Sequence, residues 1–424
     1  MKKNQFCMGI MVLIGMVSFG LFLNTKGGSL PLFLITGLAL GYILTRSRYG
    51  FAGGIKRLYL TGEGSLTKAL LLMFALSIVA TAGIHYGAAQ KGAVVAYRAI
   101  EGDTIIPGSG FVQPANLATV IGGILFGIGM MLGGGCASGT LTDTGEGYAR
   151  GWIVTIFFCI GGIFGHGMLP WWNESVFSKV GTKVYLPDIF GYIGTTIILL
   201  LILLGLYAFT RSYENKRRNE GTLIETVYDE VEKPLREAKE YKFFSYETYH
   251  KFFVERWSFA KGGVLIAVMF IFIMNTTGSS WGASGPYTLW GMWFFQKLGI
   301  SFSSPAFEGA VKSVNSGLIN NTVSIRNIGI IFGSTIALLL AGRFKFDFKF
   351  KVKDIIFYAL GGILMGYGAK VAGGCNVGAL YSGIANFSLS GWLFMASLIL
   401  GGVIGLKAFE GKVDVIPERM EKAK

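Results

Sequence analysis

Two cysteines, Cys136 and Cys375, occupy matching places in a repeated glycine-rich stretch of the sequence. Residues 122–139 read GGILFGIGMMLGGGCASG and residues 361–378 read GGILMGYGAKVAGGCNVG, with ten of the eighteen positions identical. A thiol beside glycines can present both its S–H group and backbone N–H groups to an anion, because no neighbouring side chain blocks the approach. The duplication favours this role over that of a small buried hydrophobic residue.

Further polar groups adjoin these thiols. Gly135 and Gly374 directly precede them and keep the approach open. Ser138 and Asn376 follow them and can donate hydrogen bonds to the oxygens of an oxyanion. Helix capping explains Ser138 and Asn376 almost as well, so both roles stay open.

Each copy of the stretch begins in an apolar run that is short for a membrane-spanning helix. The runs 117–132 and 355–369 have about fifteen residues each, whereas a spanning helix needs about 20. Glycine-broken hydrophobic segments at corresponding places in two halves of a chain point to a transporter's substrate site. Irregular backbone at membrane depth is tolerated only where it lines a cavity. We therefore predict that Cys136 and Cys375 lie on two broken helices that face one pore.

The composition indicates a membrane protein with many spans. Of the 424 residues, 52% are hydrophobic and only 15% are charged, and the mean hydropathy is +0.54. The net charge of +14 does not indicate nucleic-acid binding, because the basic residues lie between apolar runs. Four cysteines without a C-x-x-C pair and three scattered histidines show no zinc-site spacing, so we expect no metal and no cofactor.

Apolar runs predict ten transmembrane helices and hence an all-α polytopic membrane protein. The predicted spans are 5–24, 30–46, 67–88, 117–134, 151–170, 190–210, 262–277, 323–342, 355–371 and 388–406. Basic residues cluster at the N-terminus and in alternate loops. By the positive-inside rule, both chain termini are then cytoplasmic.

Five helices in each half have a consequence for topology. The first half, residues 1–188, enters the membrane from the cytoplasm, and the second half, residues 189–424, enters it from outside. The halves are therefore predicted to be inverted repeats whose cysteine loops meet near the middle of the membrane. Glycine-rich loops at 49–64 and 278–291 follow the second and seventh helices, and either is a candidate re-entrant segment.

Residues 211–261 differ sharply in composition from the apolar segments on either side. They contain eleven basic and ten acidic residues in 51 positions. We expect a cytoplasmic insert inside the second repeat. A solvated, mostly helical linker is favoured over a regulatory or docking role.

Lys370 interrupts an apolar run five residues before Cys375, where the first copy has Met131. A charge at such a depth suggests a functional site, and snorkelling of the ammonium to the membrane surface is an equal alternative. For His166, in the fifth predicted span, helix packing is favoured over a proton relay.

Other cysteines and charges are expected to be structural. Cys7 and Cys159 lie within apolar helices and have no counterpart in the other half, so we expect small buried hydrophobic residues there. Asp143, Glu146 and Arg150 follow Cys136 towards the cytoplasm. Carboxylates in a pore mouth would repel an anion, so these three are expected to be loop charges.

At these residues the chain resembles the YeeE/YedE family of bacterial membrane proteins, which take up thiosulfate or, in the YedE branch, are proposed to move a selenium species. The resemblance rests on the two glycine–cysteine copies, on LTRSRYGFAGGIKR at 44–57 and on GGCNVGALYSG in the second copy. In thiosulfate-type members, pathway cysteines are thought to pass the anion along by hydrogen bonds, and Cys136 and Cys375 match two of them. The resemblance implies a bacterial inner-membrane location and no enzymatic activity.

One position departs from the family pattern. Thiosulfate-type members resemble RSRFCF where this chain has RSRYGF, so Gly50 stands in place of a further cysteine. In lacking a thiol at this position, the chain resembles the YedE selenium branch. The family is also associated with small neighbouring sulfur-carrier proteins. The resemblance therefore implies that a cytoplasmic sulfur-carrier protein is a partner of this chain.

Together these features predict an inner-membrane permease that moves a small sulfur- or selenium-containing anion into the cytoplasm past the two loop cysteines. Its surroundings are the lipid bilayer, and no nucleic acid is involved. The alternatives are a thiosulfate-specific uptake channel, and a membrane sulfur or selenium relay or redox protein that works with a cytoplasmic carrier. A redox enzyme needs cofactor ligands such as paired histidines, and a structural protein does not need intramembrane thiols.

Overall fold

Ten helical segments span the molecule in a computed structural model that describes residues 3–225, 229–235, 243, 245–348 and 350–419. Within those residues, ten segments are long and apolar enough to cross a membrane. The predictions of an all-α membrane protein and of ten spans are confirmed. Of the insert expected at 211–261, positions 226–228, 236–242 and 244 lie outside the described residues.

The helices of the ten spans are α1 (Lys3–Asn24), α2 (Leu30–Ser47), α3 (Phe51–Leu60), α4 (Ser65–Gln90), α5 (Leu117–Leu132), α6 (Ala137–Glu146), α7 (Ala149–Gly167), α10 (Pro187–Asn219), α12 (Phe259–Thr277), α15 (Thr322–Leu340), α16 (Val352–Val371) and α18 (Leu389–Phe409). Of these, α3 continues the span of α2 after a break, and α6 continues the span of α5. The shorter helices are α8 (Leu169–Glu174), α9 (Val176–Lys179), α11 (Tyr246–Tyr249), α13 (Gly285–Lys297), α14 (Glu308–Asn315) and α17 (Gly383–Ala385). Two strands, β1 (Pro114–Asn116) and β2 (Gly181–Lys183), pair antiparallel. Two π-helical turns cover His250–Val254 and Asn376–Ser382, and single 3-10 turns cover Ala96–Arg98, Ser109–Phe111, Glu230–Glu232, Pro305–Phe307 and Leu318–Asn320.

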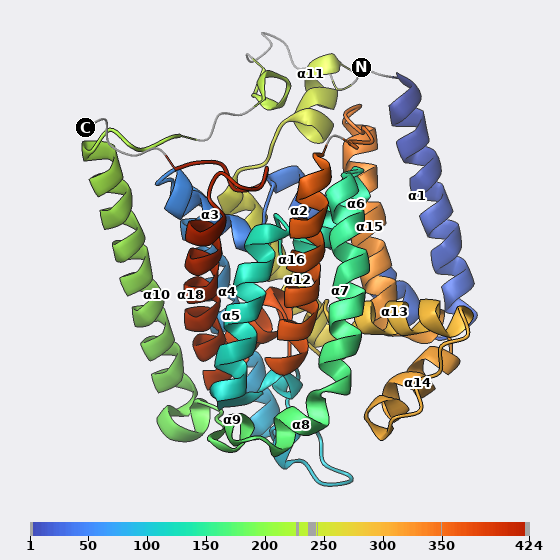
Figure 1. Cartoon of the computed structure of the whole chain (residues 1–424), viewed down its shortest axis with the longest axis vertical. Coiled ribbons are helices and arrows are strands. Elements are labelled where there is room, and N and C mark those ends of the chain that lie inside the picture. The colour runs from blue at the N-terminus through green and yellow to red at the C-terminus, as the bar shows by residue number, and fades with distance from the viewer. Residues whose placement is uncertain (1–2, 226–228, 236–242, 244, 349, 420–424) are drawn as a thin grey trace.

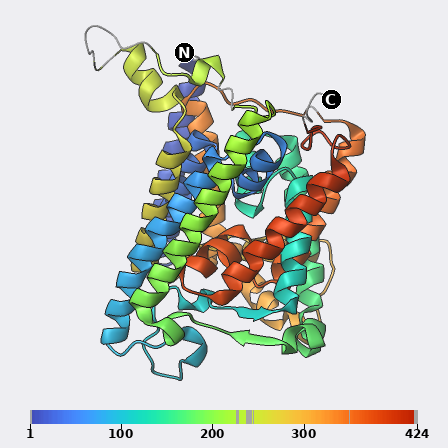
Figure 2. The same ribbon diagram turned by 90° about the vertical axis from the view of Figure 1, so that its left-hand side faces the viewer.

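The long helices run between two opposite faces of the molecule. Both chain ends and α11 lie at the top of Figure 1, on what is here named the terminal face, and α8, α9 and α14 lie at the bottom, on the distal face. The paired strands also lie on the distal face, near the bottom of Figure 2, where β1 contacts α18 and the start of α5. α5 starts beside β1 and runs towards the terminal face, whereas α16 runs the opposite way.

Glycines allow the central helices to approach closely. α5 packs against α16 and α18, and α16 also packs against α7. A Cβ atom at Gly127 would collide with the backbone of α18 at Leu398 and Gly402. A Cβ atom at Gly366 would collide with the backbone of α7 at Phe158. The G-x-x-x-G spacing of both copies thus brings backbones together, as is usual for helix contacts in membranes.

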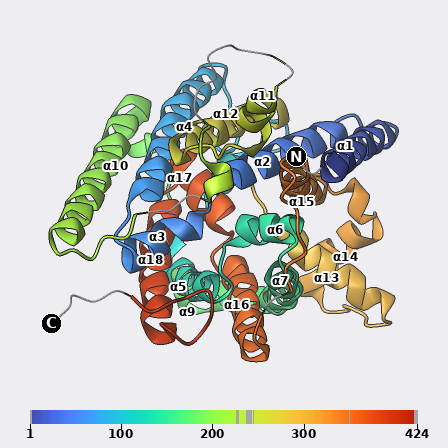
Figure 3. The ribbon, with the colours of Figure 1, turned by 90° about the horizontal axis from the view of Figure 1, so that it is seen from above.

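The helix contacts of one half have counterparts in the other. α5 packs on α18 as α16 packs on α7, and α4 packs on α12 as α15 packs on α2. At the edges, α10 packs on α4 as α1 packs on α15. Seen from above in Figure 3, α10 and α1 therefore flank the bundle on opposite sides. α6 and α17 lie between them, near the middle of the bundle.

The described part of the charged insert lies on the terminal face. α10 continues to Asn219, beyond the predicted end of its span at residue 210, so the insert begins as a helix. Further on, Arg46 of α2 donates hydrogen bonds to the carbonyl oxygens of Phe252 and Phe253, at 3.3 and 2.6 Å. Glu232 forms ion pairs with Arg48 and Arg343. These contacts fix the described part of the insert beside the end of α2.

Candidate functional site

The two cysteine loops have the same backbone form. α5 and α16 both end in a short glycine turn that precedes the cysteine. Gly134 has φ +78° and Gly373 has φ +73°, a left-handed conformation that glycine adopts without steric cost. Cys136 then begins α6, and Cys375 begins the π-helical turn 376–382. The chain thus places two thiols at matching breaks between helices.

Both thiols are buried where the two loops meet. Cys136 is 1% exposed and Cys375 is 0% exposed. α6 packs against the π-helical turn that follows Cys375. The two thiols lie within electrostatic range of each other and of the phenol of Tyr287. All four cysteines are free thiols; Cys159 is buried as expected, whereas Cys7 is exposed on α1, so the expectation of a buried residue there is wrong. A species that passes between the halves at this depth would therefore pass both cysteines.

Ser138 and Asn376, which were predicted to lie near the thiols, are both buried in this region. The Oγ of Ser138 lies 3.4 Å from the Sγ of Cys136. The Nδ2 of Asn376 donates to the Sδ of Met130 at 3.6 Å, and the Oδ1 of Asn376 has no hydrogen-bond partner among the described residues. A buried polar atom without a partner favours an additional polar group or water beside it.

Tyr287 reaches the Cys136 loop from the other half of the chain. Its side chain is fully buried on α13, and its hydroxyl donates to the carbonyl oxygen of Ala137 at 2.7 Å. Its ring stacks on Phe158 of α7, with a centroid separation of 4.2 Å. Tyr287 was not among the site residues predicted from the sequence. The signal was the segment PYTLWG in the glycine-rich loop at 278–291, which was recognised only as a possible re-entrant segment.

A cavity of about 800 Å³ extends from the terminal face to Cys136. Gly135 and its neighbouring glycines line the cavity beside the thiol. Most of the remaining lining comes from α3, the loop before it, α6, and the segments 224–225 and 414–418, with single residues of α2, α4 and α7. Gly50 lines this cavity too, and a Cβ atom there would meet no atom within 4 Å. The position where the family pattern has a cysteine therefore faces open space.

Several charges in this terminal-face cavity are neutralised in pairs. Asp143 accepts a hydrogen bond from the Nε of Arg150 at 2.9 Å, and Glu146 pairs with Arg48 at 3.3 Å. The prediction that Asp143, Glu146 and Arg150 are loop charges is wrong, because they lie in α6 and α7 and line the cavity. The carboxylates do not act as isolated negative charges, because Asp143 is paired with the nearby Arg150 and Glu146 with the distant Arg48. Lys56 of α3 also lines this cavity.

A second cavity, of about 680 Å³, lies on the distal side and reaches the Cys375 loop at Gly373 and Gly374. Lys370 and His166 line it, and no Asp or Glu is among its described lining residues. Lys370 is only partly exposed. Its side chain thus belongs to a cavity wall, in which a positive charge is not offset by a lining carboxylate.

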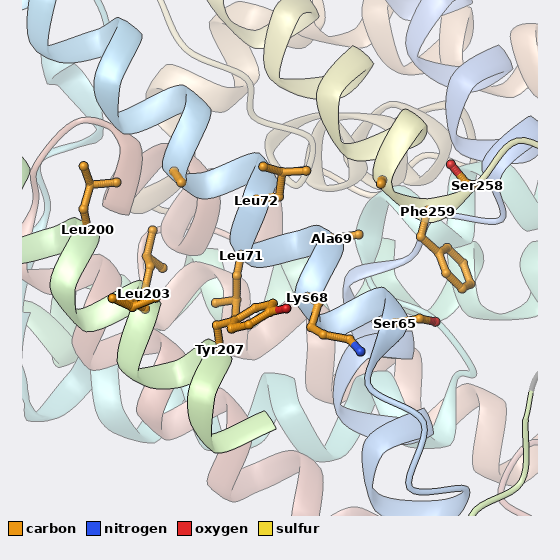
Figure 4. Close-up of a pocket in the computed structure, with 13 residues that line it drawn as sticks. Ser65, Lys68, Ala69, Leu71, Leu72, Leu200, Leu203, Tyr207, Ser258 and Phe259 are labelled. Atoms are coloured by element: carbon orange, nitrogen blue, oxygen red, sulfur yellow. The ribbon is translucent and has the colours of Figure 1, made fainter. Parts of the chain in front are cut away.

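A third hollow is apolar and separate from the cysteine loops. It has a volume of about 630 Å³ and lies between α4, α10 and the start of α12. Figure 4 shows Leu203 and Tyr207 of α10 facing Leu71 of α4. Lys68, at its polar end, forms an ion pair with Glu214 at 2.8 Å. An apolar groove of this kind is suited to lipid chains and not to a small anion.

Hydrogen bonding and soft sulfur contact are the chemistry available between the loops. Within the described part of the chain, no group of three or more His, Cys, Asp and Glu side chains is placed to hold a metal ion. The thiols of Cys136 and Cys375 are instead accompanied by hydroxyl, amide and backbone groups. Neutral donors of this kind can replace part of the hydration shell of an anion.

Named transporters are similar to this chain along most of its length. It is 26% identical over 387 residues to the thiosulfate transporter TsuA of Spirochaeta thermophila, an alignment that covers 87% of this chain and 95% of that protein. It is 24% identical over 382 residues to the thiosulfate transporter TsuA of Escherichia coli, covering 87% and 91%. The probable transporter YedE of Escherichia coli matches a shorter region, 25% identical over 173 residues, with 41% of this chain and 43% of that protein covered.

A family model described as sulphur transport matches residues 46–404. That region contains both cysteine loops, Tyr287, α5, α7 and α16, and most of α18. The family and these relatives are described as transporters and not as enzymes. By this match over most of its length, the chain belongs to the sulphur transport family.

Proposed function

We propose that this protein moves a small sulfur-containing anion across the bacterial inner membrane into the cytoplasm, between Cys136 and Cys375. One observation carries the proposal. Two cavities enter from opposite faces, and each ends at one copy of the duplicated glycine–cysteine loop. The two loops pack against each other between the cavities. The names of the relatives support a sulfur anion as the substrate.

The orientation follows from the charges. We assign the terminal face to the cytoplasm, because the basic clusters of the sequence and the charged insert lie at this end of the helices. Residues 1–188 and 189–424 are then inverted repeats, with the insert 211–261 inside the second. The matching contacts of α5 with α18 and of α16 with α7 support this division.

The proposed passage needs neutral thiols. A thiolate at either cysteine would repel the anion, whereas an S–H group donates a hydrogen bond to it. The anion enters the distal cavity, where Lys370 attracts it, and reaches Cys375. It then passes to Cys136 and leaves through the terminal-face cavity. Because both thiols are buried at the contact of the loops, a small local opening of that contact is required for each passage.

The direct test is uptake of labelled thiosulfate into proteoliposomes that contain the purified protein. The parent protein should accumulate the label, and Cys136→Ala and Cys375→Ala should each abolish accumulation while the folded protein is retained. Cys7→Ala and Cys159→Ala are the matched controls and should transport as the parent does. Full transport by both loop variants would exclude the proposed passage.

A selenium species is the second candidate substrate, and Gly50 is the observation that favours it. Thiosulfate-type members resemble a pattern with cysteine at this place, and here the position is open. The backbone at Gly50 has φ −137°, which any residue adopts, so Gly50→Cys should fold normally. Uptake of thiosulfate and of selenite should be compared in the parent and in Gly50→Cys. A gain in thiosulfate uptake at the expense of selenite would place the parent in the selenium branch.

A further inference from the structure

The terminal-face cavity contains one cation without an ion-pair partner among the described residues. Arg48, Arg57 and Arg150 each have a carboxylate oxygen within 3.3 Å. Lys56 lines the same cavity, is partly exposed, and forms no ion pair within the described part of the chain. Its charge is therefore the one most available to a mobile anion.

The charged groups that face Lys56 are Arg57, Arg150, Asp143 and Asp414. Arg57 is already paired with Glu63, and Asp143 is bound by the Nε of Arg150, so among the described residues Asp414 is the one group of these four without an ion pair. The ion pair uses the Nε of Arg150, which leaves the two terminal nitrogens of its guanidinium as further donors. Lys56 itself forms no ion pair with a described carboxylate, so its ammonium keeps its donors for a mobile anion in the cavity that reaches Cys136.

We propose that Lys56 and Arg150 form an anion-binding site in the terminal-face cavity, which receives the transported anion after it passes Cys136. The proposal rests on the proposed function. The ligand class is a small divalent sulfur oxyanion such as thiosulfate or sulfate, because ammonium and guanidinium groups bind oxyanions through charge-assisted hydrogen bonds. The inner site is thus a counterpart, on the other side of the thiols, to Lys370.

The surroundings make this site a place of release. Glu225 and Glu418 also line the terminal-face cavity, on the segments 224–225 and 414–418. An anion that leaves Lys56 passes these carboxylates and is repelled from returning. Weak, transient binding beside Cys136 followed by a negative rim favours net movement out of the cavity.

The test separates the two sides of the membrane. Proteoliposomes with uniformly oriented protein are loaded with increasing unlabelled thiosulfate on the terminal-face side, and initial uptake of labelled thiosulfate from the distal side is measured. Internal thiosulfate should inhibit uptake by occupying the inner site. In Lys56→Met, the internal concentration for half-inhibition should rise about tenfold, as expected for loss of a charge-assisted hydrogen bond. The external concentration for half-maximal uptake should not change.

Three variants exclude a merely structural effect. Lys56→Arg keeps a cation and should keep the internal half-inhibition within about twofold of the parent. Lys412→Met removes an exposed lysine of the terminal face and should behave as the parent. Lys370→Met should shift the external concentration alone. An unchanged internal half-inhibition in Lys56→Met, or equal shifts on both sides, would overturn the inner site.

The two proposals fail in different ways. If the alanine variants of Cys136 and Cys375 lose transport while Lys56→Met matches the parent on both sides, only the inner site is wrong. If both alanine variants transport normally, the pathway itself is wrong, whatever the Lys56 result.

Discussion

The two cavities that reach the cysteine loops differ in charge. The distal cavity carries Lys370 and no lining carboxylate among the described residues, whereas the terminal-face cavity carries four cations and five carboxylates. The loops themselves have the same backbone form in both copies, with a left-handed glycine two residues before each cysteine. The two copies thus share the thiols and the glycines, whereas the cavities that lead to them differ in charge.

The difference in charge between the two cavities affects the direction in which an anion moves. A cavity with an excess of positive charge concentrates an anion from dilute solution, because clefts with low-dielectric walls focus the field of their charges. A cavity whose charges are mostly paired holds an anion weakly and releases it. Under the proposed function, the thiols do not set the direction of movement, and the charges of the two cavities determine where the anion is captured and where it is released.

Of the changes considered, the loss of a loop thiol should reduce uptake most. Cys136→Ala and Cys375→Ala should both abolish uptake, because each removes the only thiol donor of its loop. The cost in folding should be small, no more than about 1–2 kcal/mol for one small sulfur. Cys136→Ser and Cys375→Ser sharpen the result. Retained uptake in the serine variants would indicate hydrogen bonding alone, and loss of uptake would indicate a contact that requires sulfur.

The loss of the distal cation should have the next largest effect. Lys370→Met should raise the external concentration for half-maximal uptake by about tenfold and leave the maximal rate nearly unchanged, because capture and not passage depends on that charge. The effect should shrink in high salt, which screens a partly exposed charge. Lys312→Met, at an exposed lysine paired with Glu308, is the control. Normal half-saturation in Lys370→Met would remove the charge difference as the basis of capture.

The duplicated motif made the general fold and the position of both thiols predictable from the sequence. Apolar runs gave the ten spans, because a spanning helix must satisfy its backbone internally and bury apolar side chains in lipid. The glycine clusters marked the breaks after α5 and α16, because Gly134 and Gly373 adopt a backbone conformation that other residues avoid. These are local constraints, and a single sequence displays them directly.

The partners that meet the loops from a distance could not be predicted. Tyr287 bonds to Ala137 across 150 positions of the chain, and Arg48 pairs with Glu146 across 98. Such contacts follow from how α2, α6 and α13 pack, which no local pattern contains. For the same reason Glu146 was interpreted as a repelling charge, since its neutralising arginine comes from another helix. Lys56 was visible in the sequence only as one of several basic residues near α3.

Removing one partner of a neutralised pair should bring a moderate loss. In Arg48→Met, Glu146 stays buried without this cation beside the path, so initial uptake should fall by about fivefold. The double variant Arg48→Met with Glu146→Gln removes both charges and should recover to within about twofold of the parent. Uptake by Arg48→Met, Glu146→Gln, the double variant and the parent forms a double-mutant cycle. Equal losses in the single and double variants would show that pairing does not govern the terminal-face cavity.

The smallest effect is expected at Tyr287, which belongs to the contact between the halves and to neither set of charges. Tyr287→Phe removes the hydroxyl that donates to Ala137 and leaves that buried carbonyl oxygen without this donor. An unpaired buried polar group costs about 1–3 kcal/mol, and here the cost falls on the loop that holds Cys136. The ring still stacks on Phe158, so the helices should stay in place.

Initial uptake in Tyr287→Phe should therefore fall by about threefold, with external half-saturation and internal half-inhibition both near their parent values. Equal behaviour on the two sides is the informative result, because Tyr287 touches the shared passage and a cavity variant shifts one side alone. Tyr358→Phe is the control, since Tyr358 is a buried tyrosine on α16 whose hydroxyl forms no hydrogen bond to any described residue. A shift on one side alone in Tyr287→Phe would mean that the contact between the loops belongs to one cavity. The two sides would then differ in gating, with one side closed by the contact and the other side open.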